Sequence, residues 1–457
     1  MTGVPASPPG SGGPVLSRRG FLRNAAAVAG VTLGGAALAG CSSSVVSGLA
    51  VSHSAPGGLD YWNLFGGGDG VRMQEMLDGF RKANPDVGLS AVTLTWGNPY
   101  YTKLSLATIG DKPPGVAVSH LTRMKNLVKA DLLQELREED LARHGLTADK
   151  FNEQTWKAGL VDGKVYAIPL DTHPIVTFYN TDVCKKAGLL DADGKLKPLD
   201  SEEAFTEAMQ RAKAVTGGFG GVIPINNETA TPWRVFWSLY SQLGGEMLAD
   251  NGTRVTIDDD KATQVLDLLS GVTKSQLMPS SIDYQGSVAM FANGQAAFLF
   301  QGEWEISTFQ TAKTPFSMTL FPNLFGGDRY ACQADSHTLV VPKQPTDDPE
   351  LLDRSLRLVR SMLDQSNTWA AGGHVPSWRP YLDSEDFKKL SPQSNYASAA
   401  DAAAYDPEGW YSGSGSNFEI VTGSAIGSAM SGQQSPAAAL AQMHDQLGTL
   451  AATDSPL

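Results

Sequence analysis

The sequence predicts an α/β protein with two lobes, each built on a mainly parallel sheet flanked by helices. From residue 59 onward, short apolar stretches alternate with amphipathic stretches of helical period, and this order is typical of strands joined by crossover helices. From residue 59 onward the chain has about 400 residues, which is longer than one ordinary domain. A hydrophobic content of 42% with nine tryptophans is sufficient for a substantial core.

Residues 1–40 are predicted to be an export signal. Arg18 and Arg19 precede an apolar run over residues 25–39, which is too short and too rich in Ala and Gly to span a membrane. The paired arginines resemble a twin-arginine signal. The small residues before Cys41 resemble a bacterial lipobox, which predicts that Cys41 is lipidated and becomes the mature N-terminus. The alternative is a cleaved signal peptide in which Cys41 has no role.

Residues 41–58 are predicted to be a flexible tether, because they are rich in Ser, Gly and Ala and lack periodicity. Removing the signal with its three arginines leaves 32 basic and 48 acidic residues, a net charge of −16. An acidic surface without a basic run argues against nucleic acid or an anionic bilayer as partner. We therefore expect an extracytoplasmic protein held at the cell membrane by the lipid on Cys41.

The first folded block predicts strands alternating with helices. Strands are predicted at residues 59–64, 87–96 and 115–119. Between them lie an amphipathic helix that ends at Asn84-Pro85 and a second helix over residues 100–109. In such sheets ligands meet the loops that follow the carboxyl ends of the strands. Those loops carry Asn63, Phe65, Asp69, Trp96, Asn98, Tyr100, Ser119 and His120.

The rest of the chain predicts a mostly helical middle block, from about residue 178 to 314, followed by a return to strands. Helices are expected to start at Ser201 and Thr231, and Asp258 is expected to cap a third after a turn at Asn251-Gly252. Strands are expected at residues 296–300, 316–321 and 338–341, before an Ala- and Ser-rich helical end. Export permits a disulfide, but the sequence alone does not pair Cys184 with Cys332.

Four segments, in order along the chain, resemble family 1 extracellular solute-binding proteins, the receptors of sugar-importing ABC transporters. Residues 80–86 resemble the end of the family's first helix, and residues 162–169 with 178–180 resemble its crossing between lobes. Residues 291–297 with 302–304 resemble its Gly-x-Trp segment, and residues 372–376 its late loop. The structural class is that of maltose-binding protein, so the resemblance implies a periplasmic-binding-protein-like fold with the ligand in a cleft between lobes.

The resemblance also implies how the chain is divided. The N-terminal lobe is expected to comprise residues 59–172 and 318–373, and the C-terminal lobe residues 173–317 and 374–457. Hinges are expected near residues 171–175, 316–322 and 373–375. The implied function is a receptor that binds a mono- or oligosaccharide and delivers it to ABC permease subunits. We expect it to act as a monomer, without catalysis.

Candidate ligand contacts are aromatic side chains, which stack on sugar rings, and polar side chains, which bond hydroxyls. Trp304 matches the family's stacking tryptophan, with Glu303 beside it, and Asp171 and His173 follow the hinge crossing. The remaining candidates lie in strand-end loops, on a helix or in the late loop: Trp96, Asn98, Asp69, His120, Trp233, Trp378 and His374. Trp237 lies one turn from Trp233, and aromatic residues at this spacing are more often core than cleft.

Other chemistries lack their sequence patterns. The Gly-rich segment 66–70 has no Gly-Lys-Ser/Thr, and residues 191–196 break the pattern of a calcium loop. No motif predicts a metal site or a cofactor. Two alternatives to a sugar receptor stay open: the same fold binding another polar solute such as a glycerophosphodiester, or an exported glycan-active hydrolase, since acidic pairs are plentiful. Which sugar is bound depends on pocket shape, which the sequence does not give.

Overall fold

The computed structural model describes residues 57–327 and 329–455, which belong to one compact unit. The predicted signal peptide, Cys41 and nearly all of the predicted tether lie outside these residues. Across the described ranges, no helix combines the length and apolar character needed to cross a membrane.

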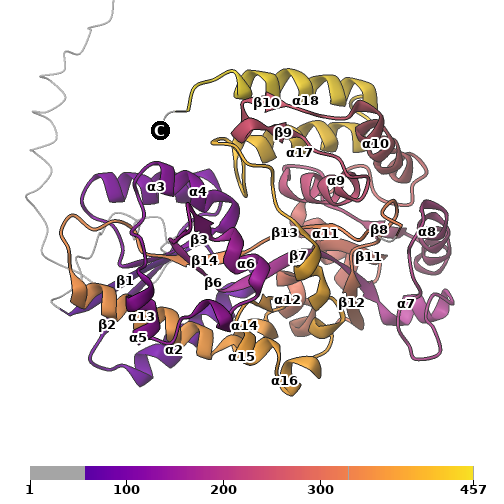
Figure 1. Cartoon of the computed structure of the whole chain (residues 1–457). Coiled ribbons are helices and arrows are strands. Elements are labelled where there is room, and N and C mark those ends of the chain that lie inside the picture. The colour runs from indigo at the N-terminus through magenta and orange to yellow at the C-terminus, as the bar shows by residue number, and fades with distance from the viewer. Residues whose placement is uncertain (1–56, 328, 456–457) are drawn as a thin grey trace, which may run out of the picture. The chain divides into compact units, whose positions relative to one another are not determined.

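Two sheets organise the described residues (Figure 1). The first has the strand order β2-β1-β3-β14-β6. Its strands are β1 (Gly58–Asn63), β2 (Gly88–Thr93), β3 (Val116–His120), β6 (Ala167–Pro169) and β14 (His337–Val340). The pairs β1–β2 and β1–β3 are parallel, whereas β14 runs antiparallel to both β3 and β6. The carboxyl ends of β1, β2 and β3 therefore share one edge.

The second sheet is built around the long strand β7 (Asp171–Asn180). Its other strands are β8 (Phe219–Val222), β11 (Ala296–Gly302), β12 (Phe316–Leu320), β13 (Cys332–Asp335), β15 (Val375–Pro376) and β16 (Ala403–Ala404). β8–β11 and β13–β16 are parallel, but every partner of β7 is antiparallel to it. Both sheets thus contain more antiparallel pairs than the predicted alternation of strands and helices implies. The antiparallel partners include strands from distant parts of the chain, such as β14 beside β3 in the first sheet and β13 beside β7 in the second.

Helices cover both sheets. The first lobe, the elements around the first sheet, contains α2 (Asp69–Ala83), α3 (Asn98–Ile109), α4 (Leu121–Lys129), α5 (Glu138–Arg143), α6 (Glu153–Ala158), α13 (Pro349–Asp364), α14 (Ser366–Ala371), the short helix η1 (Ala148–Lys150) and the two-stranded β4 (Leu160–Val161) with β5 (Lys164–Val165). Figure 1 shows the orange helices α13 and α14 returning to lie beside α2.

The second lobe, the elements around the second sheet, is richer in helix. It contains α7 (Thr181–Lys186), α8 (Glu202–Thr216), α9 (Ala230–Gln242), α10 (Asp259–Lys274), α11 (Tyr284–Ala292), α12 (Ile306–Thr311), α15 (Arg379–Leu382), α16 (Glu385–Lys388), α17 (Asn417–Met430) and α18 (Pro436–Ala451). Short elements complete it: β9 (Leu248–Ala249), β10 (Arg254–Val255), η2 (Asp250–Gly252), η3 (Glu303–Glu305), η4 (Gln393–Asn395) and η5 (Ala397–Ala402).

Separate apolar cores lie in the two lobes. One core joins β1, β3 and β14 to helices such as α2, where Met73, Met76, Leu77 and Phe80 are buried on one face, as predicted. The other two cores lie on opposite faces of the second sheet. Along β7, Ile175 and Tyr179 face one core while Val176 and Phe178 face the other, since successive strand residues point to opposite sides.

The chain passes between the sheets through short segments. Leu170 alone separates β6 from β7, and Ser336 alone separates β13 from β14. A third passage leads from α14 through residues 372–374 to β15. Strand β12 lies wholly within the second sheet, paired with β7 along its length, so the second passage is at Ser336 and not at the predicted segment 316–322. The residue boundaries predicted for the lobes stay a prediction.

Local signals located several elements correctly. The Ser201 side chain accepts a hydrogen bond from the Ala204 amide at the start of α8, and Asp258 does the same for Lys261 at the start of α10. The predicted turn before residue 254 is the β9–β10 hairpin. Cys184 and Cys332 are both buried and are not bridged to each other.

Candidate functional site

A cavity of about 430 Å³ lies between the carboxyl-end edge of the first sheet and the second lobe. Its first-lobe wall is formed by the loops after β1 and β2, the end of β3 and the start of β14. Its second-lobe wall is formed by β7, η3 and the start of α9 and of α11. The lining residues are Leu64, Gly66, Gly67, Asp69, Leu94, Thr95, Trp96, His120, His173, Glu228, Ala230, Arg234, Tyr284, Gln285, Trp304, Glu305 and His337.

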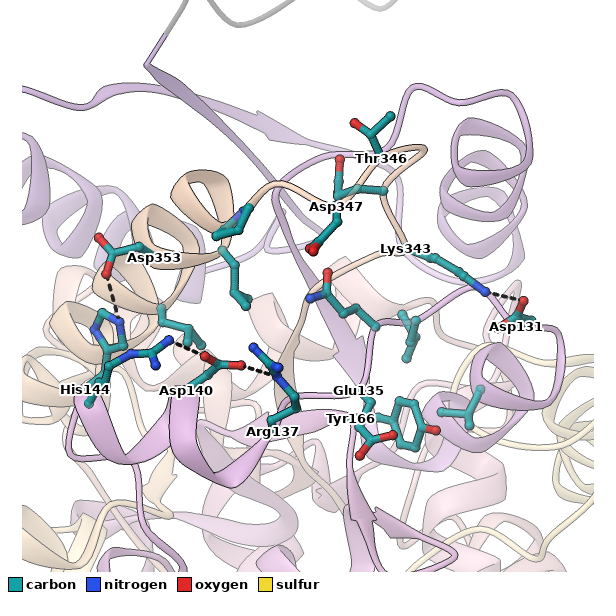
Figure 2. A pocket seen from close by; sticks show the side chains of 18 residues that line it. Asp131, Glu135, Arg137, Asp140, His144, Tyr166, Lys343, Thr346, Asp347 and Asp353 are labelled. Carbon is teal, nitrogen blue, oxygen red and sulfur yellow. Dashed lines mark hydrogen bonds and ion pairs between the residues drawn. The ribbon is translucent and has the colours of Figure 1, made fainter.

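A larger hollow, about 620 Å³, lies entirely within the first lobe (Figure 2). Most of its charged side chains are already paired: Arg137 with Asp140 at 2.7 Å, His144 with Asp353 at 3.2 Å, and Lys343 with Asp131. The lining of this hollow contains one tyrosine, Tyr166, and no tryptophan. We therefore take the smaller cavity between the sheets as the candidate site.

Two indole rings and one guanidinium dominate the candidate site. The Arg234 guanidinium carbon lies 5.1 Å from the centre of the Trp304 ring and 5.7 Å from that of Trp96. Trp96 is 37% exposed and comes from the first lobe, whereas Trp304 is half-buried and comes from the second. Glu419, which is not among the lining residues, lies 3.8 Å from Arg234. The site thus presents flat apolar faces from both lobes.

The position of Trp304 is fixed by its neighbours. Its Nε1–H donates to the Tyr284 hydroxyl at 2.9 Å, which donates in turn to Glu305 at 2.6 Å. The ring folds back over Gly302, where an added Cβ would lie 1.9 Å from Cζ3. The Gly of the Gly-x-Trp segment is therefore needed because the indole occupies the space of a side chain.

One carboxyl group of the cavity lining has an oxygen without a hydrogen-bond partner among the described residues. Asp69 begins α2 directly after the Gly-rich segment, and its Oδ1 is buried with no hydrogen-bond partner in the part of the chain that is described. Burial raises the pKa of this carboxyl, which His374 and His337 partly oppose. Asp69 Oδ1 is thus an acceptor available to a ligand hydroxyl.

Three histidines line the cavity, and two of them, His173 and His337, are held by one buried carboxylate. Asp171 Oδ2 lies 2.8 Å from His337 Nδ1, and Asp171 Oδ1 lies 3.2 Å from His173 Nδ1. Burial alone would raise the pKa of the Asp171 carboxyl, but His337 and the adjoining imidazoles hold it well below its usual range. Burial lowers the pKa of His173 to about 3 and that of His120 well below its ordinary value.

Comparison with known proteins decides the family. The family model described as a bacterial extracellular solute-binding protein matches residues 75–391. The chain belongs to this family. It is 28% identical over 382 residues to the arabinooligosaccharide-binding protein of Bacillus subtilis (strain 168), covering 79% of this chain and 81% of that protein.

Two further relatives support the assignment. A maltooligosaccharide ABC transporter solute-binding lipoprotein of Streptococcus pneumoniae (strain ATCC BAA-255 / R6) is 23% identical over 255 residues, which span 53% of this chain and 54% of that protein. The structure of maltose-bound T. maritima MalE3 superposes with a TM-score of 0.72 at 18% identity, covering 86% of this chain and 99% of that one. This likeness confirms the predicted two-lobed α/β fold.

In this solute-binding protein, five of the residues singled out in the sequence line the cavity together: Asp69, Trp96, His120, His173 and Trp304. Two others, Asp171 and Glu303, are fully buried behind it. His374 is also fully buried, stacked on Trp369 at 4.1 Å, and lies 3.0 Å from Glu303 and 3.2 Å from Asp171. Burial disfavours its charge, but the two carboxylates outweigh this and raise the pKa of His374 to about 10.

The last three candidates lie away from the cavity lining. Asn98 begins α3 and donates to Asn417 at 3.0 Å, which joins the two lobes. Trp233 is fully buried and donates to Asp406 at 3.0 Å, stacked on Trp237. Trp378 packs on Phe151 in the first-lobe core. A role for any candidate in ligand binding stays a prediction.

Several lining residues were not singled out from the sequence. Tyr284, Glu228 and Gln285 come from helix starts of the second lobe, where the sequence shows only ordinary capping residues. His337 had a usable signal, because it directly precedes the strand predicted at residues 338–341. Arg234, the one charged residue of α9, stood out from the sequence only as one of the few basic residues near the predicted cleft.

Proposed function

We propose that this solute-binding protein is a monomeric receptor that binds a neutral mono- or oligosaccharide in the cavity between its lobes and delivers it to an ABC importer. The observation that carries the proposal is the pair of indole faces, Trp96 and Trp304, that enter one cavity from opposite lobes. Sugar rings present apolar C–H faces to such surfaces and hydroxyls to the polar rim. The names of the two relatives, which refer to arabino- and malto-oligosaccharides, support this ligand class.

The charge of the lining favours a neutral ligand. Arg234 is the one cationic side chain among the described lining residues, apart from histidines, and the same lining holds three carboxyl groups: Asp69, Glu228 and Glu305. A glycerophosphodiester would bring a further negative charge into this acidic surrounding, which costs electrostatic free energy. The alternative ligand is therefore disfavoured.

Calorimetry tests the ligand class directly. Titration with arabino- and malto-oligosaccharides of increasing length, and with monosaccharides, is expected to yield at least one ligand of micromolar or tighter affinity. Glycerophosphocholine serves as the anionic comparison. Binding of the phosphodiester without binding of any sugar would overturn the proposal. The bound sugar is expected to be recovered chemically unchanged by mass spectrometry, and shortened products would indicate a hydrolase.

We further propose that the protein is exported through a twin-arginine signal and anchored by lipid on Cys41. The support is the sequence pattern of residues 18–41 and the lipoprotein named among the relatives. Cys41→Ser is expected to release the protein from the membrane fraction or to leave it uncleaved, whereas Ser42→Ala is expected to leave it anchored. A Cys41→Ser protein that is still processed and membrane-bound would contradict the anchor.

A further inference from the structure

Three histidines from distant parts of the chain meet at the floor of the cavity. His120 ends β3, His337 begins β14, and these two are cross-strand partners in the first sheet. His173 lies on β7 of the second sheet, paired with Asp335. One ligand nitrogen of each histidine lies within 4.8 Å of the others. All three side chains line the cavity, and at 2–4% exposure they are nearly withdrawn from bulk water.

Each imidazole is oriented through the same ring nitrogen. His120 Nδ1 lies 2.8 Å from the Tyr101 hydroxyl, His337 Nδ1 lies 2.8 Å from Asp171 Oδ2, and His173 Nδ1 lies 3.2 Å from Asp171 Oδ1. A carboxylate accepts hydrogen bonds, so the two imidazoles beside it carry their proton on Nδ1 and leave the lone pair on Nε2. This is the arrangement by which carboxylates orient metal-binding histidines in proteins.

The orienting carboxylate is itself fixed. Asp171 Oδ1 accepts from the His337 backbone N–H at 2.8 Å, and its Oδ2 accepts from Trp369 Nε1–H at 2.7 Å. These two bonds hold the carboxylate in one rotamer, and a side chain locked in this way keeps the rings that it contacts near one geometry. Asp171, which the sequence predicted as a ligand contact, thus lies behind the histidines that line the cavity.

We propose that His120, His173 and His337 form a binding site for one divalent transition-metal ion, with Zn²⁺ as the representative ion. Imidazole nitrogens suit Zn²⁺, Co²⁺, Ni²⁺ and Cu²⁺, whereas Mg²⁺ and Ca²⁺ prefer oxygen ligands. Three protein ligands leave one tetrahedral position, which faces the cavity and takes water or a ligand oxygen. In such a site, with Zn–N distances of about 2.0–2.1 Å, the nitrogens lie ~3.3 Å apart. Because the His173 and His337 rings stack with their centres 4.0 Å apart and an interplanar angle of 23°, ion binding has to tilt these rings so that their nitrogens converge.

A second set of potential ligands, Asp171, His337 and His374, lies deeper. His374 is fully buried, stacked on Trp369, and outside the cavity lining. Its Nδ1 lies between the Asp171 and Glu303 carboxylates. An ion that enters from the cavity therefore meets the three lining histidines first, and the proposal commits to them.

The test is titration of the tag-free protein with Zn²⁺ alone by calorimetry, and with Co²⁺ alone by visible absorption, in the absence of any sugar. We expect one saturable site per chain, intense tetrahedral Co²⁺ bands, and a Zn²⁺-dependent rise in melting temperature. Mg²⁺ is expected to give none of these signals. Because no sugar is present, failure of this test leaves the proposed carbohydrate function intact, and success does not depend on it.

Variants assign the ligands. His120→Gln, His173→Gln and His337→Gln are each expected to abolish the Co²⁺ bands, and Asp171→Asn to weaken Zn²⁺ binding about 10–100-fold. The matched controls are His144→Gln and His444→Gln, which remove histidines paired elsewhere, with Asp353 and Asp259. Melting curves check that each variant folds. If a variant does not fold, the Co²⁺ spectrum of the unmodified protein still tests whether the site exists.

Several results would overturn the site. Absence of saturable Zn²⁺ and Co²⁺ binding by the unmodified protein would do so at once. Binding that survives His120→Gln and His173→Gln but is lost in His374→Gln would assign the ion to the deeper set. Binding lost in either surface control would show adventitious coordination elsewhere on the chain.

Discussion

Trp304 is the residue where the fold, the cavity and the proposed ligand meet. Its ring occupies the space above Gly302, its indole N–H is held by Tyr284, and the Arg234 guanidinium lies over it. The Gly68 backbone of the first lobe also approaches closely, since a Cβ there would lie 3.0 Å from the Trp304 carbonyl oxygen. The ring is therefore held in place before any ligand arrives, which lowers the entropy lost on binding.

The first prediction follows from this placement. Trp304→Ala is expected to weaken sugar binding by about 2 kcal/mol or more, roughly 30-fold, as for other buried aromatic anchors. Because the ring is only half-buried, the melting temperature is expected to change little. The control is Trp410→Ala, which removes a partly buried tryptophan bonded to the Thr453 carbonyl, away from the cavity. Full sugar affinity with a lowered melting temperature would show that Trp304 is merely core.

A second prediction at this scale concerns pH. Burial raises the pKa of Glu419 to about 8; Arg234 opposes the shift, while Asp406 and Glu228 add to it. An unfolded glutamate titrates near about 4.3, so between these values the folded protein binds more protons than the unfolded chain. The free energy of unfolding therefore falls as the pH rises from about 4.3 to 8.

Glu419→Gln removes this titration and is expected to flatten the fall in stability over that window. Urea midpoints measured at intervals from pH 5 to 9 for both proteins provide the comparison. Glu203→Gln, at an exposed position in the first turn of α8, is the control and should leave the pH slope unchanged. An equal slope in the Glu419→Gln protein would mean that this carboxyl is ionised in the folded state.

At the scale of elements, the two lobes touch through the backbone of two buried glycines. Gly97, before α3, and Gly415, before α17, both have positive φ, and a Cβ on Gly415 would lie 2.5 Å from the Gly97 Cα. Around this contact the Ser414 amide donates to the Thr122 hydroxyl at 3.1 Å, and Asn126 donates to the Trp410 carbonyl at 3.1 Å. These contacts join the two lobes beside Trp96, which lines the cavity.

Gly415→Ala is therefore expected to hold the lobes apart and to raise the dissociation constant for sugar about tenfold or more, a cost of ~1.4 kcal/mol. The matched control is Gly432→Ala, where φ is also positive, at 76°, but nothing lies within 4 Å of the added Cβ. Both variants should lose similar stability through backbone strain. Equal sugar affinity for the two would show that the Gly97–Gly415 contact does not matter for binding.

Elements with strong local signals were predictable from the sequence, and those that depend on distant partners were not. The caps at Ser201 and Asp258 act within one turn, so the residues there are sufficient to locate the start of a helix. The direction of β14 depends on pairing with β3, more than 200 residues away, which no local pattern encodes. The second crossing between the sheets was predicted too early in the chain for the same reason. The residues of β12 predict a strand, but they do not show which sheet that strand joins.

The candidate site divides in a similar way. The rule that ligands meet the carboxyl ends of parallel strands led to Asp69, Trp96, Asn98 and His120, and all of these except Asn98 line the cavity. The opposite wall depends on how the second lobe faces the first, so Tyr284 and Glu228 were not foreseen. The histidine cluster escaped notice because its members are spaced 53 and 164 residues apart along the chain and match no metal motif.

At the scale of the whole molecule, the described residues form a closed arrangement in which both lobes contribute to one cavity. The connections that allow opening are narrow: single residues at Leu170 and Ser336, and the short segment 372–374. The contacts between α3 or α4 and residues 408–417 are polar or are backbone packing at glycines. A ligand held by both lobes would favour the closed form by its differential affinity for it.

The last prediction is that sugar closes the protein. Small-angle scattering of one preparation, measured with and without a saturating sugar of proven affinity, is expected to show a smaller radius of gyration with sugar, since the ligand-free ensemble includes open forms. The Gly415→Ala protein should show a smaller change, because its closed form is disfavoured by contact with Gly97, whereas Gly432→Ala should behave as the unmodified protein does. Identical curves with and without sugar in the unmodified protein would mean that the lobes do not move about Leu170 and Ser336, and that ligands enter by another route.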